Sequence, residues 1–147
     1  MTITPEPGAD WVVRGTDRDE YIEVMRIVSE ALLMPERPEE REPRVRPLMD
    51  AEGYDRVLVA VDGDEVVGTV NGFAFEMTMP GGPRAVTGVT GVGVWPTHRR
   101  RGILSAMMRR QLADVHARGG KYAALWASEG AIYGRFGYGR AATEMET

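Results

Sequence analysis

The residues best suited to chemistry lie between Val92 and Ser105, where a glycine-containing strand, a proline and three arginines precede an amphipathic segment. This order is typical of an anion site. The first N–H groups of a helix have no partner within the helix, and the helix dipole adds partial positive charge there. Consecutive arginines would add charge-assisted hydrogen bonds, and Gly102 would let a ligand approach the backbone closely. The pattern favours a phosphate or pyrophosphate ligand over a solvated basic loop.

Three consecutive antiparallel strands are predicted ahead of this loop, because apolar and β-branched residues are separated by turn residues. They cover residues 56–61, 65–79 and 84–94, with turns at 62–64 and 80–83. The last strand contains Gly88, Gly91 and Gly93. Glycine weakens a strand, so three of them indicate a bulge or a close approach to the backbone by another group.

Helices and shorter strands surround these three strands. Apolar residues three and four apart predict a helix from about 17 to 33 and another from 103 to about 117, which Gly119 and Gly120 should end. The other predicted elements are a strand at 11–14, a strand at 122–126, a short helix at 130–136, a turn at 137–139 and a final strand. The class is therefore mixed α/β (α+β) around one central sheet.

The segment from Pro35 to Pro47 contains four prolines among alternating charges. Proline removes a backbone donor and biases the preceding residue away from the helical conformation. We therefore predict a mobile, solvated connection here, followed at most by a short helix through Leu48 and Met49. Such a loop could flank a substrate entrance, although a plain solvated loop is the simpler interpretation.

The composition is that of a soluble protein with one domain over residues 1–147, since 43% of the residues are hydrophobic and 27% are charged. The formal net charge of −4 argues against a nucleic-acid partner, because such proteins usually carry a basic excess. Without cysteine, disulfides and a cysteine nucleophile are excluded, and no metal site is predicted. No apolar run of about 18 residues and no secretory leader is present, so we expect no membrane partner and a cytoplasmic location.

Five residues of the basic segment match the pattern Val-x-Val-x-Pro-x-x-Arg-x-x-Gly, namely Val92, Val94, Pro96, Arg99 and Gly102. This pattern resembles the acyl-CoA-binding motif of the GNAT acetyltransferases. That superfamily usually has a small residue two positions after the glycine, whereas this chain has a leucine. Pro-Thr-His-Arg-Arg-Arg-Gly followed by two aliphatic residues resembles instead the enhanced intracellular survival (Eis) branch of the superfamily.

A second segment, residues 127–139, is similar to another signature of the Eis branch. It reads Ala-Ser-Glu-Gly-Ala-Ile-Tyr-Gly-Arg-Phe-Gly-Tyr-Gly. Two long motifs in the correct order are hard to obtain by chance, although the first 80 residues fit only in the order of their elements. The resemblance implies the GNAT fold, a mixed central sheet flanked by helices.

The resemblance also implies roles by position. Contacts with the cosubstrate acetyl-CoA would fall on Val92, Gly93, Val94, Arg99, Arg100, Arg101, Gly102, Ile103, Leu104, Ser105, Ser128 and Glu129. The first three belong to the bulged strand beside the thioester, and the arginine-rich group holds the pyrophosphate and the neighbouring pantetheine. Tyr133 matches the tyrosine that protonates the leaving thiolate. Without the motif, packing on a short helix would be its simplest interpretation.

These motifs do not identify the general base that deprotonates the amine. In Eis-like proteins this role resembles that of the C-terminal carboxylate of a much longer polypeptide, which carries a second GNAT-like domain and a sterol-carrier-like domain. We therefore expect this chain to be a fragment of such a protein, with a minimal relative as the alternative. His98 matches the phosphate loop, where a loop-stabilising hydrogen bond is expected. His116 is expected to be structural.

The resemblance implies an N-acetyltransferase that transfers acetyl from acetyl-CoA to a primary amine by direct attack in a ternary complex. The acceptor would be a small molecule such as an aminoglycoside, or a lysine side chain, and the acidic balance of the chain favours a cation. A non-catalytic acyl-CoA-binding or assembly module is the alternative. The third hypothesis is a phosphate or nucleic-acid binder that uses the arginine loop. The oligomeric state is open, a homo-oligomer included.

Overall fold

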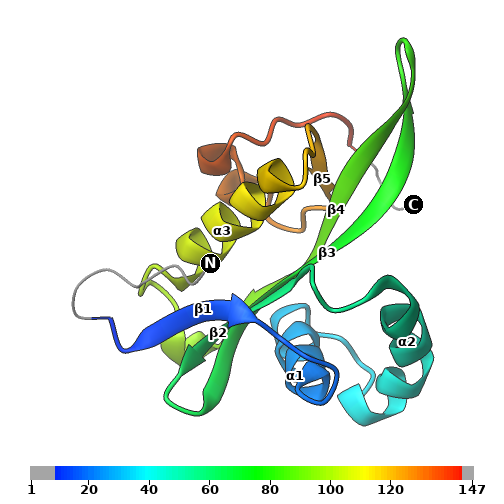
Figure 1. Ribbon diagram of the computed structural model, residues 1–147. Helices are drawn as coiled ribbons and strands as arrows, with labels where there is room; N and C mark the ends of the chain where they lie inside the picture. Colours follow the sequence, from blue (N-terminus) through cyan, green and yellow to red (C-terminus); the bar gives the residue numbers. More distant parts are fainter. Residues whose placement is uncertain (1–8, 144–147) are drawn as a thin grey trace.

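Valine-rich segments build the central sheet of this chain, whose computed structural model describes residues 9–143. Five strands lie in the order β1-β2-β3-β4-β5 (Figure 1). Their bounds are β1 Trp11–Gly15, β2 Val57–Asp62, β3 Glu65–Met79, β4 Gly82–Val94 and β5 Ala123–Leu125. The first four strands are antiparallel to their neighbours, and β5 pairs with β4 in parallel. The predicted mixed sheet and its three consecutive antiparallel strands are confirmed.

Helices cover both faces of this sheet, with α1 and α2 on one face and α3 on the other (Figure 1). Their bounds are α1 Tyr21–Ala31, α2 Pro38–Glu52 and α3 Ile103–Ala117. Along β2, Val57, Val59 and Val61 pack with the cluster of α1, whereas Leu58 and Ala60 pack with the cluster of α3. A strand that is buried on both faces has a continuous apolar sequence, as β2 does here.

The three glycines in the interior of β4, Gly88, Gly91 and Gly93, each have a separate structural reason. Gly91 lies in a bulge, where two residues of β4 stand opposite one residue of β3, and its φ is +57°. A Cβ atom on Gly93 would come within 2.6 Å of Cβ of Ala31 in α1. A Cβ atom on Gly88 would come within 2.2 Å of the ring of Phe73. The predicted bulge and close backbone approach are therefore both present.

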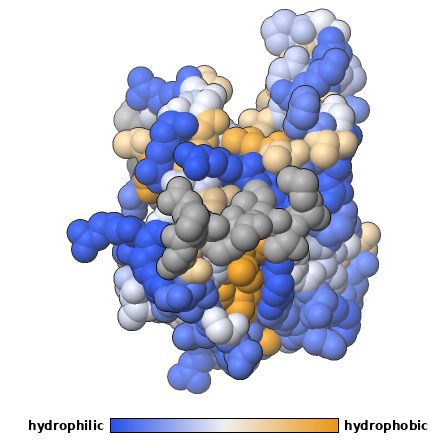
Figure 2. Space-filling view, turned by 60° about the vertical axis from the view of Figure 1, so that its left-hand side comes forward, coloured by the Kyte–Doolittle hydropathy of each residue, from blue (hydrophilic) through white to orange (hydrophobic). Residues whose placement is uncertain are grey.

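The outer ends of β3 and β4 form a hairpin that projects beyond the other strands (Figure 1). Figure 2 shows that the projecting end is mainly hydrophilic, and that apolar residues gather closer to its base. The rings of Phe73 and Phe75 lie 5.6 Å apart on β3. This arm leaves the inner halves of the two strands, with the bulge, as the part of the sheet that packs against the helices.

The prediction of a mobile loop at residues 35–47 is wrong, because most of this segment belongs to α2. Pro38 is the first residue of this helix, where a missing N–H costs no hydrogen bond. Pro43 and Pro47 lie inside the helix, and each removes one donor. Val45 and Met49, four residues apart, pack against the apolar cluster of α1. That spacing was the helical signal that the prolines concealed.

α1 is shorter than the predicted helix at 17–33. A turn precedes it, because the Asp17 carboxylate accepts hydrogen bonds from the N–H groups of Asp19 and Glu20 at 3.0 and 2.9 Å. The helix ends before Leu33, whose φ of +50° lies in the left-handed region. The chain turns there toward α2.

The elements after the basic loop follow the predictions in part. α3 has the predicted bounds, and Gly119 follows it with a φ of +79°. Two short 3-10 turns, η2 Gly130–Ile132 and η3 Gly134–Phe136, replace the single short helix that was predicted. As far as residue 143 the predicted final strand is absent, and residues 144–147 lie outside the described part of the chain.

Candidate functional site

A cleft of about 510 Å³ opens where the inner end of β4, the basic loop and the start of α3 meet the segment after β5. Its lining residues are Ala31, Leu32, Val92, Gly93, Val94, His98, Arg99, Arg100, Gly102, Ile103, Leu104, Ser105, Ser128, Glu129, Ile132, Tyr133 and Arg135. Every predicted site residue except Arg101 is among them. Residues more than 30 positions apart in the sequence are thus brought together in one cavity.

The basic loop has a backbone suited to an anion. A 3-10 turn, η1 Pro96–His98, leads into it, and Arg100 and Gly102 both have left-handed backbones, with φ of +61° and +81°. Left-handed residues in a loop can turn neighbouring N–H groups toward one point, which is an anion-binding arrangement. No side chain of the described residues caps α3. The N–H groups of Ile103, Leu104 and Ser105 are therefore available to a ligand in the cleft.

Arg100 carries strain that the sequence did not reveal. A left-handed backbone costs a residue with a side chain about 1–2 kcal/mol relative to the right-handed region. Apart from Leu33, Arg100 is the only residue other than glycine with positive φ in the described part of the chain. Strain of this kind persists where the surrounding structure holds it, and it is concentrated at functional sites.

The Arg101 side chain turns away from the cleft and toward β2. Its Nη1 atom donates to Asp62 Oδ2 at 3.2 Å, and His98 Nε2 lies 3.2 Å from the same oxygen. His98 Nδ1 lies 2.8 Å from the Thr97 hydroxyl oxygen. The expected loop-stabilising hydrogen bond of His98 is present. Asp62 was missed as a site residue, because its sequence context identified only a turn.

Tyr133 is half-buried and lines the cleft from the segment that follows β5. Its ring meets the ring of Tyr138 edge to face, with centroids 6.0 Å apart. Burial, and then the charge of Glu129, raise the pKa of the Tyr133 phenol above its ordinary value. Burial beside Tyr133 raises the pKa of Tyr138 to about 12. Tyr133 is therefore a neutral hydrogen-bond donor throughout the physiological pH range.

Several lining residues were not predicted. Arg135 lies on the same wall as Tyr133, and its guanidinium carbon is 4.9 Å from the centroid of the Phe136 ring. Ala31 and Leu32 come from the end of α1, a part of the sequence with no motif. Packing of Gly93 against α1 brings that helix to the bulge, so only the fold could identify these residues.

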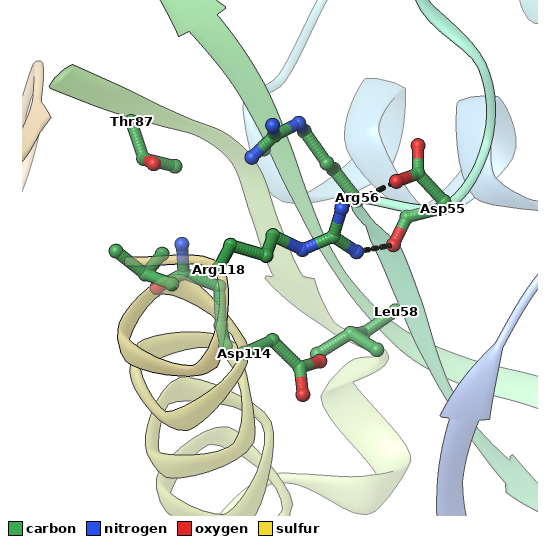
Figure 3. A pocket seen from close by; sticks show the side chains of 9 residues that line it. Asp55, Arg56, Leu58, Thr87, Asp114 and Arg118 are labelled. Atoms are coloured by element: carbon green, nitrogen blue, oxygen red, sulfur yellow. Dashed lines mark hydrogen bonds and ion pairs between the residues drawn. The ribbon is translucent and has the colours of Figure 1, made fainter. Parts of the chain in front are cut away.

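A second, much smaller cavity of about 20 Å³ lies between the C-terminal end of α3 and the sheet (Figure 3). Arg118 reaches across it to Asp55, with a guanidinium nitrogen 2.5 Å from the carboxylate and another 2.8 Å from the backbone carbonyl. The hydrogen bond from Arg118 lowers the pKa of the Asp55 carboxyl. Such a space holds about one water molecule. The Arg118–Asp55 contact ties the end of α3 to the segment that precedes β2, and the cavity is too small for a substrate.

Between residues 9 and 143, no three histidine, aspartate or glutamate side chains come together in a way that could hold a metal ion. In the same region, no helix combines the length and the apolar character needed to cross a membrane.

Comparison with known proteins finds relatives that are named N-acetyltransferases. An uncharacterized N-acetyltransferase of Streptomyces avermitilis is 56% identical over 86 residues, which are 58% of this chain and 21% of the relative. The N-acetyltransferase Eis of Mycobacterium tuberculosis is 51% identical over 88 residues, 57% of this chain and 21% of that protein. The chain thus spans only about a fifth of the length of these two relatives.

A solved structure extends the likeness to most of the chain. The crystal structure of Eis1 from Mycobacterium abscessus superposes with a TM-score of 0.75 at 34% identity, over 88% of this chain and 31% of that one. The predicted resemblance to the Eis branch and the predicted fold are both confirmed. The family model described as an acetyltransferase (GNAT) domain matches residues 12–141, and the chain therefore belongs to the GNAT acetyltransferase domain family.

Proposed function

We propose that this domain transfers the acetyl group of acetyl-CoA to a primary amine, by direct attack within a ternary complex. One observation carries the proposal: a single cleft contains the bulge of β4, the left-handed basic loop and Tyr133. These are the three parts that acyl transfer from a pyrophosphate-containing thioester needs. The cleft volume also falls within the range of ordinary small-molecule sites.

The basic loop would hold the pyrophosphate of acetyl-CoA. Arg99 and Arg100 line the cleft, and in the described part of the chain neither makes an ion pair with a carboxylate. Their guanidinium groups can bind phosphate oxygens in a planar, two-point manner. The N–H groups at the start of α3 complete the anion site. The thioester would then lie near the bulge, beside Val92 and Gly93.

The reaction requires a neutral amine, an acceptor for negative charge and a donor for the leaving group. The amine nitrogen attacks the thioester carbonyl, and a C–N bond forms as the C–S bond breaks. A backbone N–H of the bulge can stabilise the charge that develops on the carbonyl oxygen. The thiolate leaves with the electron pair of the C–S bond, and the attacking nitrogen loses one proton.

Tyr133 would serve the leaving thiolate as a hydrogen-bond donor. A phenol of ordinary pKa about 10 is a weaker acid than a thiol of pKa about 8.5, so full transfer of its proton to a free thiolate is uphill by about 1.5 pKa units. The raised pKa of Tyr133 increases this difference, but it also keeps the donor protonated. The proton given up by the amine balances the reaction. Tyr133 therefore donates a hydrogen bond to sulfur as charge develops there, and the proton that the product thiol carries comes in balance from the amine.

The acceptor is proposed by its chemistry only. A primary amine, on a small molecule or on a lysine side chain, suits the acidic balance of the chain. Ala31 and Leu32 give the cleft an apolar side at the end of α1, close to the proposed position of the acetyl group. No side chain is assigned as the base that deprotonates the amine.

Two measurements test the proposal. Calorimetric titration of the chain with acetyl-CoA should give saturable binding to one site, and addition of a panel of primary amines should release free thiol. Binding without thiol release would support a non-catalytic acyl-CoA-binding module instead. A folded sample that fails to bind acetyl-CoA would contradict the proposal.

A single substitution tests the role of Tyr133 separately. Tyr133→Phe should lower turnover about tenfold or more and leave acetyl-CoA binding unchanged, because the phenol serves only the departing thiolate. Tyr122→Phe is the matched control, since Tyr122 does not line the cleft. Equal turnover of Tyr133→Phe and the unmodified chain would remove Tyr133 from the mechanism.

A further inference from the structure

One carboxylate connects the two ends of the strained basic loop. Asp62 is the last residue of β2, and its Oδ2 atom lies 3.2 Å from both His98 Nε2 and Arg101 Nη1. His98 precedes Arg100 in the sequence, and Arg101 follows it. Asp62 does not line the cleft. It therefore reaches the loop from behind, through two side chains that lie on either side of the left-handed residue.

We infer that Asp62 is a positioning residue for acetyl-CoA, which holds residues 98–101 in the conformation that binds the pyrophosphate. This inference rests on the proposed function for its ligand, but not for the contacts themselves. The left-handed backbone of Arg100 is costly unless its neighbours fix it. Two hydrogen bonds to one charged oxygen supply that constraint, and hydrogen bonds to a carboxylate are stronger than those between neutral groups.

The burial of the group supports a fixed arrangement. The His98 and Asp62 side chains are only 15% and 25% exposed, whereas Arg101 is 38% exposed. Thr97 fixes the second ring nitrogen of His98, at 2.8 Å from its hydroxyl oxygen. The imidazole is therefore contacted on both sides, so it cannot rotate without losing a partner. Arg101 completes the group from the more exposed side.

Removal of the Asp62 charge tests the inference, because electrostatic repulsion and a positioning role predict opposite changes in ligand binding. A carboxylate close to a pyrophosphate site repels the ligand, so charge alone predicts that its removal would tighten binding. A positioning role predicts the opposite, because a loop released from Asp62 must be ordered again when the ligand binds. The inference also separates Arg101 from Arg99 and Arg100. Those two face the cleft, whereas Arg101 acts through Asp62.

The first experiment compares Asp62→Asn with the unmodified chain. The variant keeps the shape of the side chain and removes its charge, and we expect acetyl-CoA binding to weaken about tenfold in calorimetric titration. Asp64→Asn is the matched control, because Asp64 is exposed on the same turn and makes no side-chain hydrogen bond within the described residues. Its binding should be unchanged or slightly tighter. Equal or tighter binding by Asp62→Asn would overturn the inference.

Kinetics should locate the defect at the cofactor loop. Asp62→Asn should raise KM for acetyl-CoA with kcat within about twofold, because the loop contacts the pyrophosphate and not the reacting thioester.

Arg101→Gln, a change on the exposed loop, should also weaken binding. The double variant should bind no more weakly than the weaker single variant, since both changes break the same contact. Fully additive losses would mean that Arg101 acts independently, and would overturn its assignment to Asp62.

Hydrogen exchange on the free chain separates this inference from the proposed function. Backbone amides of residues 97–102 should exchange faster in Asp62→Asn than in Asp64→Asn, without any ligand. If the folded, unmodified chain does not bind acetyl-CoA, the proposed function fails, and this comparison still decides whether Asp62 holds the loop. Equal exchange in the two variants would overturn the positioning role.

Discussion

α2 and α3 have the same length of 15 residues, but different forces hold them in place. α3 buries Ile103, Met107, Met108, Gln111 and Val115 against the sheet. α2 buries no residue completely. Only the partly buried Val45 and Met49 pack α2 on the cluster of α1, and three ion pairs add to this contact, Arg18 with Asp50, Arg26 with Glu39 and Arg44 with Glu36.

The difference explains where the candidate site lies. A ligand that binds backbone N–H groups needs a helix end that does not move relative to the sheet. Buried apolar contacts give α3 such a fixed end, and its N-terminus faces the cleft. The pairs that join α2 to other segments are largely exposed, and such pairs contribute little and are screened by salt, so α2 is the more easily displaced helix. We therefore expect α3 to carry the cofactor site, and α2 to tolerate change.

The largest expected effect is the loss of a buried α3 side chain. Met107 is fully buried, and its terminal methyl lies 3.0 Å from where a Cβ on Gly68 would be. Met107→Ala should lower the free energy of unfolding by about 2–5 kcal/mol, measured by urea denaturation at constant slope. Leu48→Ala on α2, where the side chain is 67% exposed, should change it by less than about 0.5 kcal/mol. Similar losses in the two variants would contradict the comparison.

A smaller effect, of opposite sign, is expected inside α2. Pro43→Ala restores an N–H group that can donate to the carbonyl of Glu39, and an interior proline costs a helix about 3 kcal/mol relative to alanine. Amide exchange within α2 should slow by up to that equivalent, while exchange within α3 stays the same. Slower exchange in both helices would show that α2 and the packed core open together, and the proposed independence of α2 would be lost.

The two ends of α3 provide a third and smaller test. Gly102 and Gly119 have nearly the same left-handed φ, +81° and +79°, and neither has an atom closer than 3.9 Å to an added Cβ. Replacing either by alanine should cost about 1–2 kcal/mol of stability through the backbone alone. Only Gly102→Ala should also weaken acetyl-CoA binding, because Gly119 is far along the helix from the cleft. Equal binding by the two variants would contradict the assignment of the ligand to the N-terminal end.

The same contrast shows what the sequence could predict. The bounds of α3, its glycine stop and the basic loop follow from local patterns, namely apolar residues at helical spacing and a motif of consecutive residues. The bulge of β4 was predictable because glycine in a strand is rarely accidental. α2 was not predicted, since the helical spacing of Val45 and Met49 is short, Pro43 precedes it and Pro47 lies within it.

Contacts that depend on the fold could not be predicted from the sequence. Asp62 and Arg101 are 39 positions apart, and no local pattern joins an aspartate in a turn to an arginine in a distant loop. Ala31 and Leu32 reach the cleft only because α1 packs on β4. The strain at Arg100 is a property of its backbone, and arginine itself gives no sign of it. The sequence therefore identified the ligand-binding segment but not the residues that support it.

The smallest expected effects are the losses of stability when two ion pairs of the same sequence spacing, one on each helix, are removed. Arg46 pairs with Glu42 on α2, and Arg110 pairs with Asp114 on α3 through Nε at 2.9 Å. Glu42→Gln should cost about 0.3–0.5 kcal/mol, the usual value for a pair four residues apart on a helix. Asp114→Asn should cost more, about 1 kcal/mol, because the Arg110 Nη1 atom is buried without a hydrogen-bond partner among the described residues, whereas Arg46 also donates to the Arg18 carbonyl oxygen at 3.1 Å. Thermal unfolding in low and high salt gives both values. A larger, more salt-sensitive loss on α2 than on α3 would show that its ion pairs fix α2 as firmly as packing fixes α3.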